Sequence, residues 1–150
     1  AENLYVAEKN LKNAPAIIKL HNKGIGAGRH LELSASGHGN SLQYRTSSLK
    51  TRECMKNAMV QTFKLAEVCG EVRGCIPFIL KVDIEGAEDW LFREEVDYLK
   101  EFYAIVVELH DWMEPGVVVS NSFLEFVASI DCQVLVNQDL LWILPKRNIK

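Results

Sequence analysis

Carboxylates gather where an apolar stretch of the chain turns polar. The segment 77–82 is apolar except for one lysine, and Asp83, Glu85 and Glu88 follow it within a few positions. A continuous apolar run of this kind, rich in branched side chains, predicts a strand covered on both faces. Ligands in open α/β sheets bind beyond the carboxyl ends of strands. We therefore predict that these acids lie where proton transfer or ligand binding takes place.

A second acidic strand end follows further along the chain. The run 103–109 contains Glu108, and His110 comes directly after the run. Neighbouring strands lie roughly 4.8 Å apart, so Asp83 and Glu108 can share one site if their strands pair in parallel. Imidazole gains and loses a proton near neutral pH, which makes His110 a candidate base. Asp83, Glu108 and His110 are therefore the candidate catalytic residues, and Lys81, on the same side of its strand as Asp83, is expected to pair with an acid.

Apolar periodicity and turn residues predict the elements that position these side chains. Helices are predicted at 2–13, 65–69, 86–100 and 120–130, and strands at 17–20, 29–33, 41–45, 59–63, 78–83, 103–109, 133–136 and 140–144. The alternation of strands and helices predicts a single α/β domain over residues 1–150 with a mostly parallel sheet. The turn at 137–139 predicts that the last two strands form an antiparallel hairpin. The glycine-containing segment 22–28 is expected to be a loop.

Composition and charge argue against several classes of function. The chain is 48% hydrophobic and 25% charged with a net charge of −3, which is typical of a globular protein. It carries no basic run suited to nucleic acid or to an anionic membrane, and no apolar run approaches the roughly 18 residues of a membrane span. The four cysteines form no C-x-x-C pair, so we expect free thiols and a cytoplasmic location.

Two short motifs resemble those of a known enzyme family. Residues 81–88 read KVDIEGAE, and residues 107–112 read VELHDW. The first resembles the K-x-D-x-E-G-x-E motif of the FkbM family of S-adenosylmethionine-dependent methyltransferases, and the second resembles that family's E-x-H segment after the next strand. The helix at 2–13, the strand at 17–20 and the turn at 22–26 are also similar to the family's run after its second strand.

The resemblance implies a Rossmann-like class I methyltransferase sheet, mostly parallel, with an antiparallel C-terminal hairpin and with its first strands truncated. The chain would then be the C-terminal portion of the family domain. The resemblance also implies S-adenosylmethionine as the cofactor, bound by Asn22, Lys23, Asp83 and Glu85, with no metal ion. The expected reaction is O-methylation of a hydroxyl on a small-molecule acceptor such as a sugar or a secondary metabolite.

The same residues leave two other functions open. Asp83, Glu85, Glu108 and His110 offer oxygen and nitrogen ligands that suit Mg²⁺ or Mn²⁺, as in a metal-dependent hydrolase. The chain could instead be a non-catalytic methyltransferase-like module. A sheet without its first strands exposes an edge, and exposed edges pair with other chains. We therefore also expect a homodimer formed through that edge.

Overall fold

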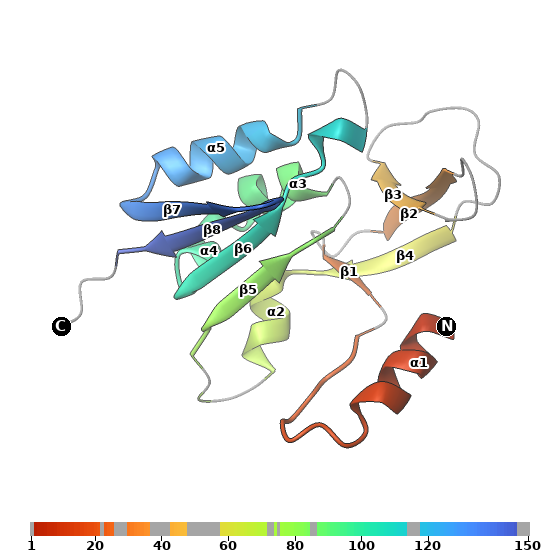
Figure 1. The fold of residues 1–150 in the computed structure, drawn as a ribbon. Helices are drawn as coiled ribbons and strands as arrows, with labels where there is room; N and C mark the ends of the chain where they lie inside the picture. The colour runs from red at the N-terminus through yellow and green to blue at the C-terminus, as the bar shows by residue number, and fades with distance from the viewer. Residues whose placement is uncertain are drawn as a thin grey trace.

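The structure is a computed structural model that describes residues 2–21, 23–25, 30–36, 43–47, 58–71, 74, 76–84, 87–113 and 118–146. Its helices are α1 (Glu2–Leu11), α2 (Leu65–Gly70), α3 (Glu88–Glu94), α4 (Val96–Leu99), the 3₁₀ helix η1 (Asp111–Met113) and α5 (Ser120–Ala128). Its strands are β1 (Gly24–Ile25), β2 (His30–Ser36), β3 (Gln43–Ser47), β4 (Ala58–Phe63), β5 (Ile79–Val82), β6 (Ala104–Glu108), β7 (Cys132–Asn137) and β8 (Leu140–Pro145). Figure 1 shows their arrangement.

The second half of the chain forms a four-stranded sheet in the order β5-β6-β8-β7. β5 and β6 pair in parallel, whereas β8 is antiparallel both to β6 and to β7. β5, β6 and β7 therefore run in one direction, and only β8 opposes them. This confirms the predicted α/β class, with a mostly parallel sheet and an antiparallel C-terminal hairpin. The hairpin turns at Gln138, whose φ of 55° is the left-handed conformation that tight hairpin turns require.

The first half of the chain forms a second sheet in the order β1-β4-β2-β3. β1 pairs in parallel with β4, and the other pairings are antiparallel. Two predictions fail here. Residues 17–20 form no strand, because one edge of β4 is paired with Gly24–Ile25 instead. The predicted loop at 22–28 accordingly contains the short strand β1. An apolar run forms a strand only if a neighbouring strand supplies hydrogen bonds, and sequence alone does not identify that neighbour.

Helices α3 and α5 cover one face of the β5-β6-β8-β7 sheet (Figure 1). The ring of Phe92 on α3 packs against Phe123 and Phe126 on α5, with ring centroids 5.1 and 5.4 Å apart. Beneath them lie buried branched side chains from the strands: Val82, Ile105, Val107 and Ile143. β6 is buried on both faces from residue 104 to residue 107, which makes it the central strand of the core. The core thus fixes the two strand ends that carry the candidate residues.

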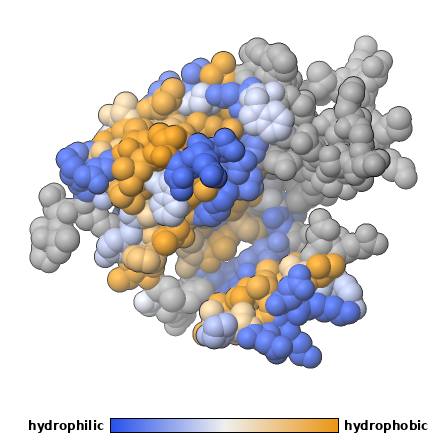
Figure 2. Space-filling view, in the orientation of Figure 1, coloured by the Kyte–Doolittle hydropathy of each residue, from blue (hydrophilic) through white to orange (hydrophobic). Residues whose placement is uncertain are grey.

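β5 is an edge strand, and one of its faces is exposed because Ile79 and Lys81 are both accessible, which contradicts the prediction that both faces are covered. Among the described strands it pairs only with β6, and Ile79 is 54% exposed. Ile76 and Phe78, just before the strand, are also exposed. Figure 2 shows hydrophobic side chains, in orange, over the region of this sheet and α5. The homodimer through an exposed sheet edge stays a prediction. No helix among the described residues is long and apolar enough to cross a lipid bilayer.

The single helix predicted over 86–100 is two helices that meet at Glu95. Glu95 has φ −108° and ψ 17°, outside the helical range, while the backbone hydrogen bonds continue on both sides of it. The Glu95 carboxylate is buried and accepts a hydrogen bond from the backbone of Leu65 at the start of α2. The break therefore lies where a buried acid leaves its own helix to cap another one, a tertiary contact that local periodicity does not reveal.

Replacement of Glu95 by glutamine is expected to stabilise the protein at pH 7. Burial raises the pKa of Glu95, although the Leu65 backbone N–H and Lys64 favour the charged form. The folded state therefore binds the proton more tightly than the unfolded state does, so stability falls as pH rises from the ordinary glutamate value of about 4.3 through the raised pKa. Glu95→Gln removes this loss of stability at higher pH, because an amide does not ionise. It keeps an oxygen that accepts the hydrogen bond from the Leu65 backbone N–H. Urea unfolding at pH 5 and pH 7 measures both effects.

Glu95→Ala serves as the matched variant because it removes the acceptor itself. It should lower the free energy of unfolding by about 1–3 kcal/mol, since a buried backbone N–H loses its partner. A Glu95→Gln protein that unfolds at lower urea concentration than the wild type at pH 7 would contradict this account of the carboxylate.

Candidate functional site

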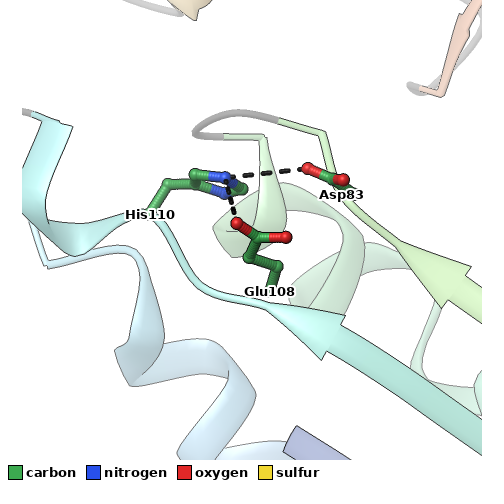
Figure 3. A group of neighbouring side chains, drawn as sticks. All are labelled: Asp83, Glu108 and His110. Carbon is green, nitrogen blue, oxygen red and sulfur yellow. Dashed lines mark ion pairs between the residues drawn. The ribbon is translucent and has the colours of Figure 1, made fainter. Parts of the chain in front are cut away.

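The carboxyl ends of β5 and β6 bring three of the predicted residues together. Val82 lies opposite Val107 in the parallel register, so the next positions along, Asp83 and Glu108, face each other. His110 follows two positions later and turns back over both acids (Figure 3). One ligand atom from each of Asp83, Glu108 and His110 lies within 4.8 Å of the other two. The predicted two-strand site therefore exists as a side-chain cluster.

His110 is held by a buried carboxylate on its far side. Its Nδ1 lies 2.5 Å from Oε1 of Glu88, the first residue of α3. The Glu88 side chain is 0% exposed and the His110 side chain is 4% exposed. A carboxylate accepts hydrogen bonds, so Nδ1 is the donor in this contact. In the neutral imidazole the Nε2 atom then carries a lone pair, whereas in the protonated form both nitrogens donate.

The Nε2 atom of His110 faces the two strand-end acids. It lies 3.7 Å from Asp83 Oδ1 and 3.9 Å from Glu108 Oε1. Both distances are longer than a hydrogen bond. No hydrogen bond joins His110 Nε2 to another described residue. The arrangement presents a basic nitrogen and two carboxylate oxygens, all directed toward one point.

Lys81 pairs with the remaining oxygens of the same two acids, as expected from its position on β5. Its Nζ lies 3.1 Å from Asp83 Oδ2 and 3.6 Å from Glu108 Oε2. Each carboxylate therefore has one oxygen toward Lys81 and the other toward His110. Three carboxyl groups, Glu88 included, and one amine therefore surround the imidazole, so acidic groups outnumber basic ones beside it. Such a cluster favours cationic ligands.

The loop after β6 is fastened to α5. Asp111 Oδ1 accepts a hydrogen bond of 2.9 Å from the backbone N–H of Ser120, the first residue of that helix. A capping interaction at this position stabilises a helix by typically ~1 kcal/mol, and here it also holds the position after His110. Trp112 is 66% exposed, with its ring centroid 6.2 Å from that of His110. An exposed aromatic side chain therefore stands beside the cluster.

Of the four residues that the resemblance assigned to the cofactor, the structure describes two. Asp83 is in the cluster, and Lys23 is exposed just before β1. Asn22 and Glu85 lie outside the described residues. A cavity of about 410 Å³ lies at the other end of β5, since Ile76 and Pro77 before that strand contribute to its wall. It is lined by Ile17, Lys19, His21, Val68, Cys69, Ile76 and Pro77.

Glu88 is the residue whose importance the sequence understated. An acid in the first turn of a helix is favoured by the helix dipole, and that local explanation is sufficient on its own. The structure shows instead a fully buried side chain that fixes His110, 22 positions away. The available signal was its place as the last acid of the 81–88 motif, because only one of the three acids in that motif was needed to start the helix.

The two cysteines that the structure describes form no disulfide bond. Cys69 and Cys132 are both free and half-buried, and Cys54 and Cys75 lie outside the described residues. Burial raises the pKa of the Cys132 thiol, which disfavours the reactive thiolate. The Asp83–Glu108–His110 cluster is therefore a better candidate for chemistry than either thiol.

No protein-family model, curated protein or solved structure matches the chain.

Proposed function

We propose that this chain is an S-adenosylmethionine-dependent O-methyltransferase with a Rossmann-like sheet, similar to the FkbM family, acting on a hydroxyl of a small-molecule acceptor. The observation that carries the proposal is the imidazole nitrogen of His110 directed at Asp83 and Glu108, at the carboxyl ends of adjacent parallel strands. The 81–88 and 107–112 motifs supply the reaction class. The antiparallel C-terminal hairpin agrees with the sheet that the resemblance implies.

The cluster has the chemistry that an acceptor hydroxyl needs. S-adenosylmethionine supplies a methyl group on a positively charged sulfur. A net negative cluster suits that charge, which is the fit between these residues and the cofactor. The hydroxyl oxygen must lose its proton as it attacks, and the cluster can accept that proton at His110 Nε2 or hold a group that acidifies the hydroxyl. Glu88 then stabilises the charge that forms on the imidazole, as buried carboxylates beside catalytic histidines do.

The exposed Trp112 ring beside His110 offers an apolar face against which the acceptor can lie. Sugars and planar metabolites both pack on aromatic rings, and the indole ring is large and rigid. Its position next to the nitrogen that faces the acids would orient the hydroxyl toward the cluster. Orientation of this kind can lower the barrier of a two-substrate reaction by several kcal/mol.

A metal-dependent hydrolase is the second candidate. The specific observation in its favour is that Asp83, Glu108 and His110 place three metal-ligand atoms within 4.8 Å of one another. A hydrolase would activate water at this point and would have no use for a sulfonium cofactor. Cofactor binding therefore distinguishes the two candidates, and a module that binds neither cofactor nor metal would be the third.

Titration of S-adenosylmethionine into the protein, followed by calorimetry, tests the proposal. We expect saturable heat with one equivalent bound, and a dissociation constant that is at least about tenfold higher in Asp83→Asn, since about 1.4 kcal/mol corresponds to a factor of ten. The matched control is Asp97→Asn on α4, an exposed acid away from the cluster. An absence of heat with the wild type, or equal affinity in the two variants, would contradict the proposal.

A further inference from the structure

We propose that Asp83 Oδ1, Glu108 Oε1 and His110 Nε2 bind a divalent cation with Mn²⁺-like ligand preferences. The cation would coordinate the acceptor hydroxyl and make it more acidic, so this inference deepens the proposed function. The cation site itself rests on the geometry of the three side chains and does not require that the reaction be methyl transfer.

The spacing of the three atoms suits one cation. Two ligands bound to the same ion by bonds of about 2.1 Å lie about 3 Å apart when adjacent and about 4.2 Å apart when opposite each other. His110 Nε2 lies 3.7 Å from the Asp83 oxygen and 3.9 Å from the Glu108 oxygen. All three atoms fall within 4.8 Å of each other. Small rotations of the two acid side chains would bring them to coordination distance.

The contact between Glu88 and His110 is a second observation, independent of the ligand spacing, that points to a bound metal ion. Metal-binding histidines usually donate their second N–H to a carboxylate, which fixes the ring and raises the basicity of the binding nitrogen. Glu88 occupies this position, fully buried, 2.5 Å from Nδ1. The imidazole is 4% exposed, yet its Nε2 makes no hydrogen bond to a described residue and is aimed at the two acids. A bound cation would take the place of the proton that pairs this nitrogen with the two acids when the ring is protonated.

Lys81 orients Asp83 and Glu108 and leaves free the carboxylate oxygen of each acid that faces His110. Lys81 contacts Asp83 Oδ2 and Glu108 Oε2, the oxygens that do not face His110. Three carboxylates against one ammonium leave net negative charge to balance a dication. Asp83 and Glu108 are partly exposed, so water or a substrate oxygen can complete the coordination sphere. Open positions of this kind distinguish catalytic metal sites from structural ones.

The ligand types indicate which cations would bind. Two carboxylates and one imidazole form an oxygen-rich set without thiolate, which suits Mn²⁺ or Mg²⁺ better than a soft metal. With the cation bound, His110 Nε2 is a ligand and does not act as a base. The coordinated hydroxyl would become more acidic, so its proton would pass to solvent water as the oxygen attacks the methyl carbon and the bond from that carbon to the sulfonium sulfur breaks.

Mn²⁺ titration followed by electron paramagnetic resonance provides the test, because the signal of free Mn²⁺ falls as the ion binds. We expect one equivalent bound to the wild type and competition by Mg²⁺. Asp83→Asn and Glu108→Gln should each weaken binding more than tenfold. Glu88→Gln should weaken it about 10–100-fold, as expected for a positioning residue that does not touch the ion. Asp97→Asn should bind as the wild type does.

Circular dichroism of every variant shows whether weaker Mn²⁺ binding comes from a lost ligand or from an unfolded protein. Glu108→Gln still tests the ligand if another variant unfolds, because Glu108 is partly exposed and glutamine has nearly the same shape. Failure of folded wild-type protein to bind Mn²⁺ at millimolar concentration, or equal binding by Glu108→Gln, would overturn the inference. S-adenosylmethionine binding without Mn²⁺ binding would refute the cation site and leave the proposed methyltransferase standing. Mn²⁺ binding without cofactor binding would support the cation site and favour the hydrolase.

Discussion

Replacement of Glu88 by alanine is expected to lower the free energy of unfolding by about 3 kcal/mol. The carboxylate is fully buried and accepts the hydrogen bond from His110 Nδ1, so its removal leaves a buried N–H without its partner and opens a cavity at the start of α3. For a domain of this size the melting temperature should fall by about 6–12 °C. Urea unfolding and thermal melting both measure the change.

Glu94→Ala is the matched control, because Glu94 is an exposed glutamate on the same helix. Its substitution should change stability by no more than about 0.5 kcal/mol. A double-mutant cycle of Glu88→Ala with His110→Ala isolates the pair, and we expect a coupling energy of about 1–3 kcal/mol. If Glu88→Ala is as stable as Glu94→Ala, the buried contact is not what holds the imidazole.

Replacement of Phe92 by alanine is expected to cost about 3–5 kcal/mol of stability. The ring is buried between α3 and α5, in contact with Phe123 and Phe126, and it packs over the branched side chains of the sheet. Phe92 also lies one turn after Glu88 on the same face of α3. Loss of the ring should let the start of α3 shift, so binding of Mn²⁺ should weaken even though Phe92 is not a ligand.

Leu124→Ala on α5 provides the comparison, since Leu124 is apolar but exposed. We expect its effect on the unfolding midpoint in urea to be within the range of ordinary surface substitutions, about 0.5 kcal/mol. Phe92→Leu should be intermediate, because it keeps most of the apolar contact and creates a smaller cavity. Similar midpoints for Phe92→Ala and Leu124→Ala would show that α3 and α5 are not joined through this ring.

Most features that depend on neighbours in sequence could be predicted. The strands that end in Asp83 and Glu108, and the turn at 137–139, follow from short apolar runs and from turn residues, whose preferences are local. The pairing of Lys81 with Asp83 follows from the two-residue period of a strand, which places both side chains on one face. These local rules placed the side chains at the ends of two strands, and their meeting also required that β5 and β6 pair in parallel.

The features that depend on distant partners could not be predicted in this way. Residues 17–20 have the composition of a strand but form none, because β1 pairs with β4 instead. The apolar run at 77–82 suggested burial on both faces, whereas one face of β5 is exposed. The interruption at Glu95 depends on a hydrogen bond to α2, far away in the sequence. In each case the structure depends on how two segments that are distant in the sequence lie relative to each other. The sequence of one segment does not identify the other.

The division between the two sources of information is clearest at His110. Amino-acid order alone placed two acids and an imidazole at the ends of consecutive strands, because strand length and side-chain alternation are properties of a short segment. Only the packing of α3 against α5 brought Glu88 behind the imidazole and turned Nε2 toward the acids. That orientation depends on the core contacts between two helices and a sheet, and it converts three nearby polar residues into a single candidate site.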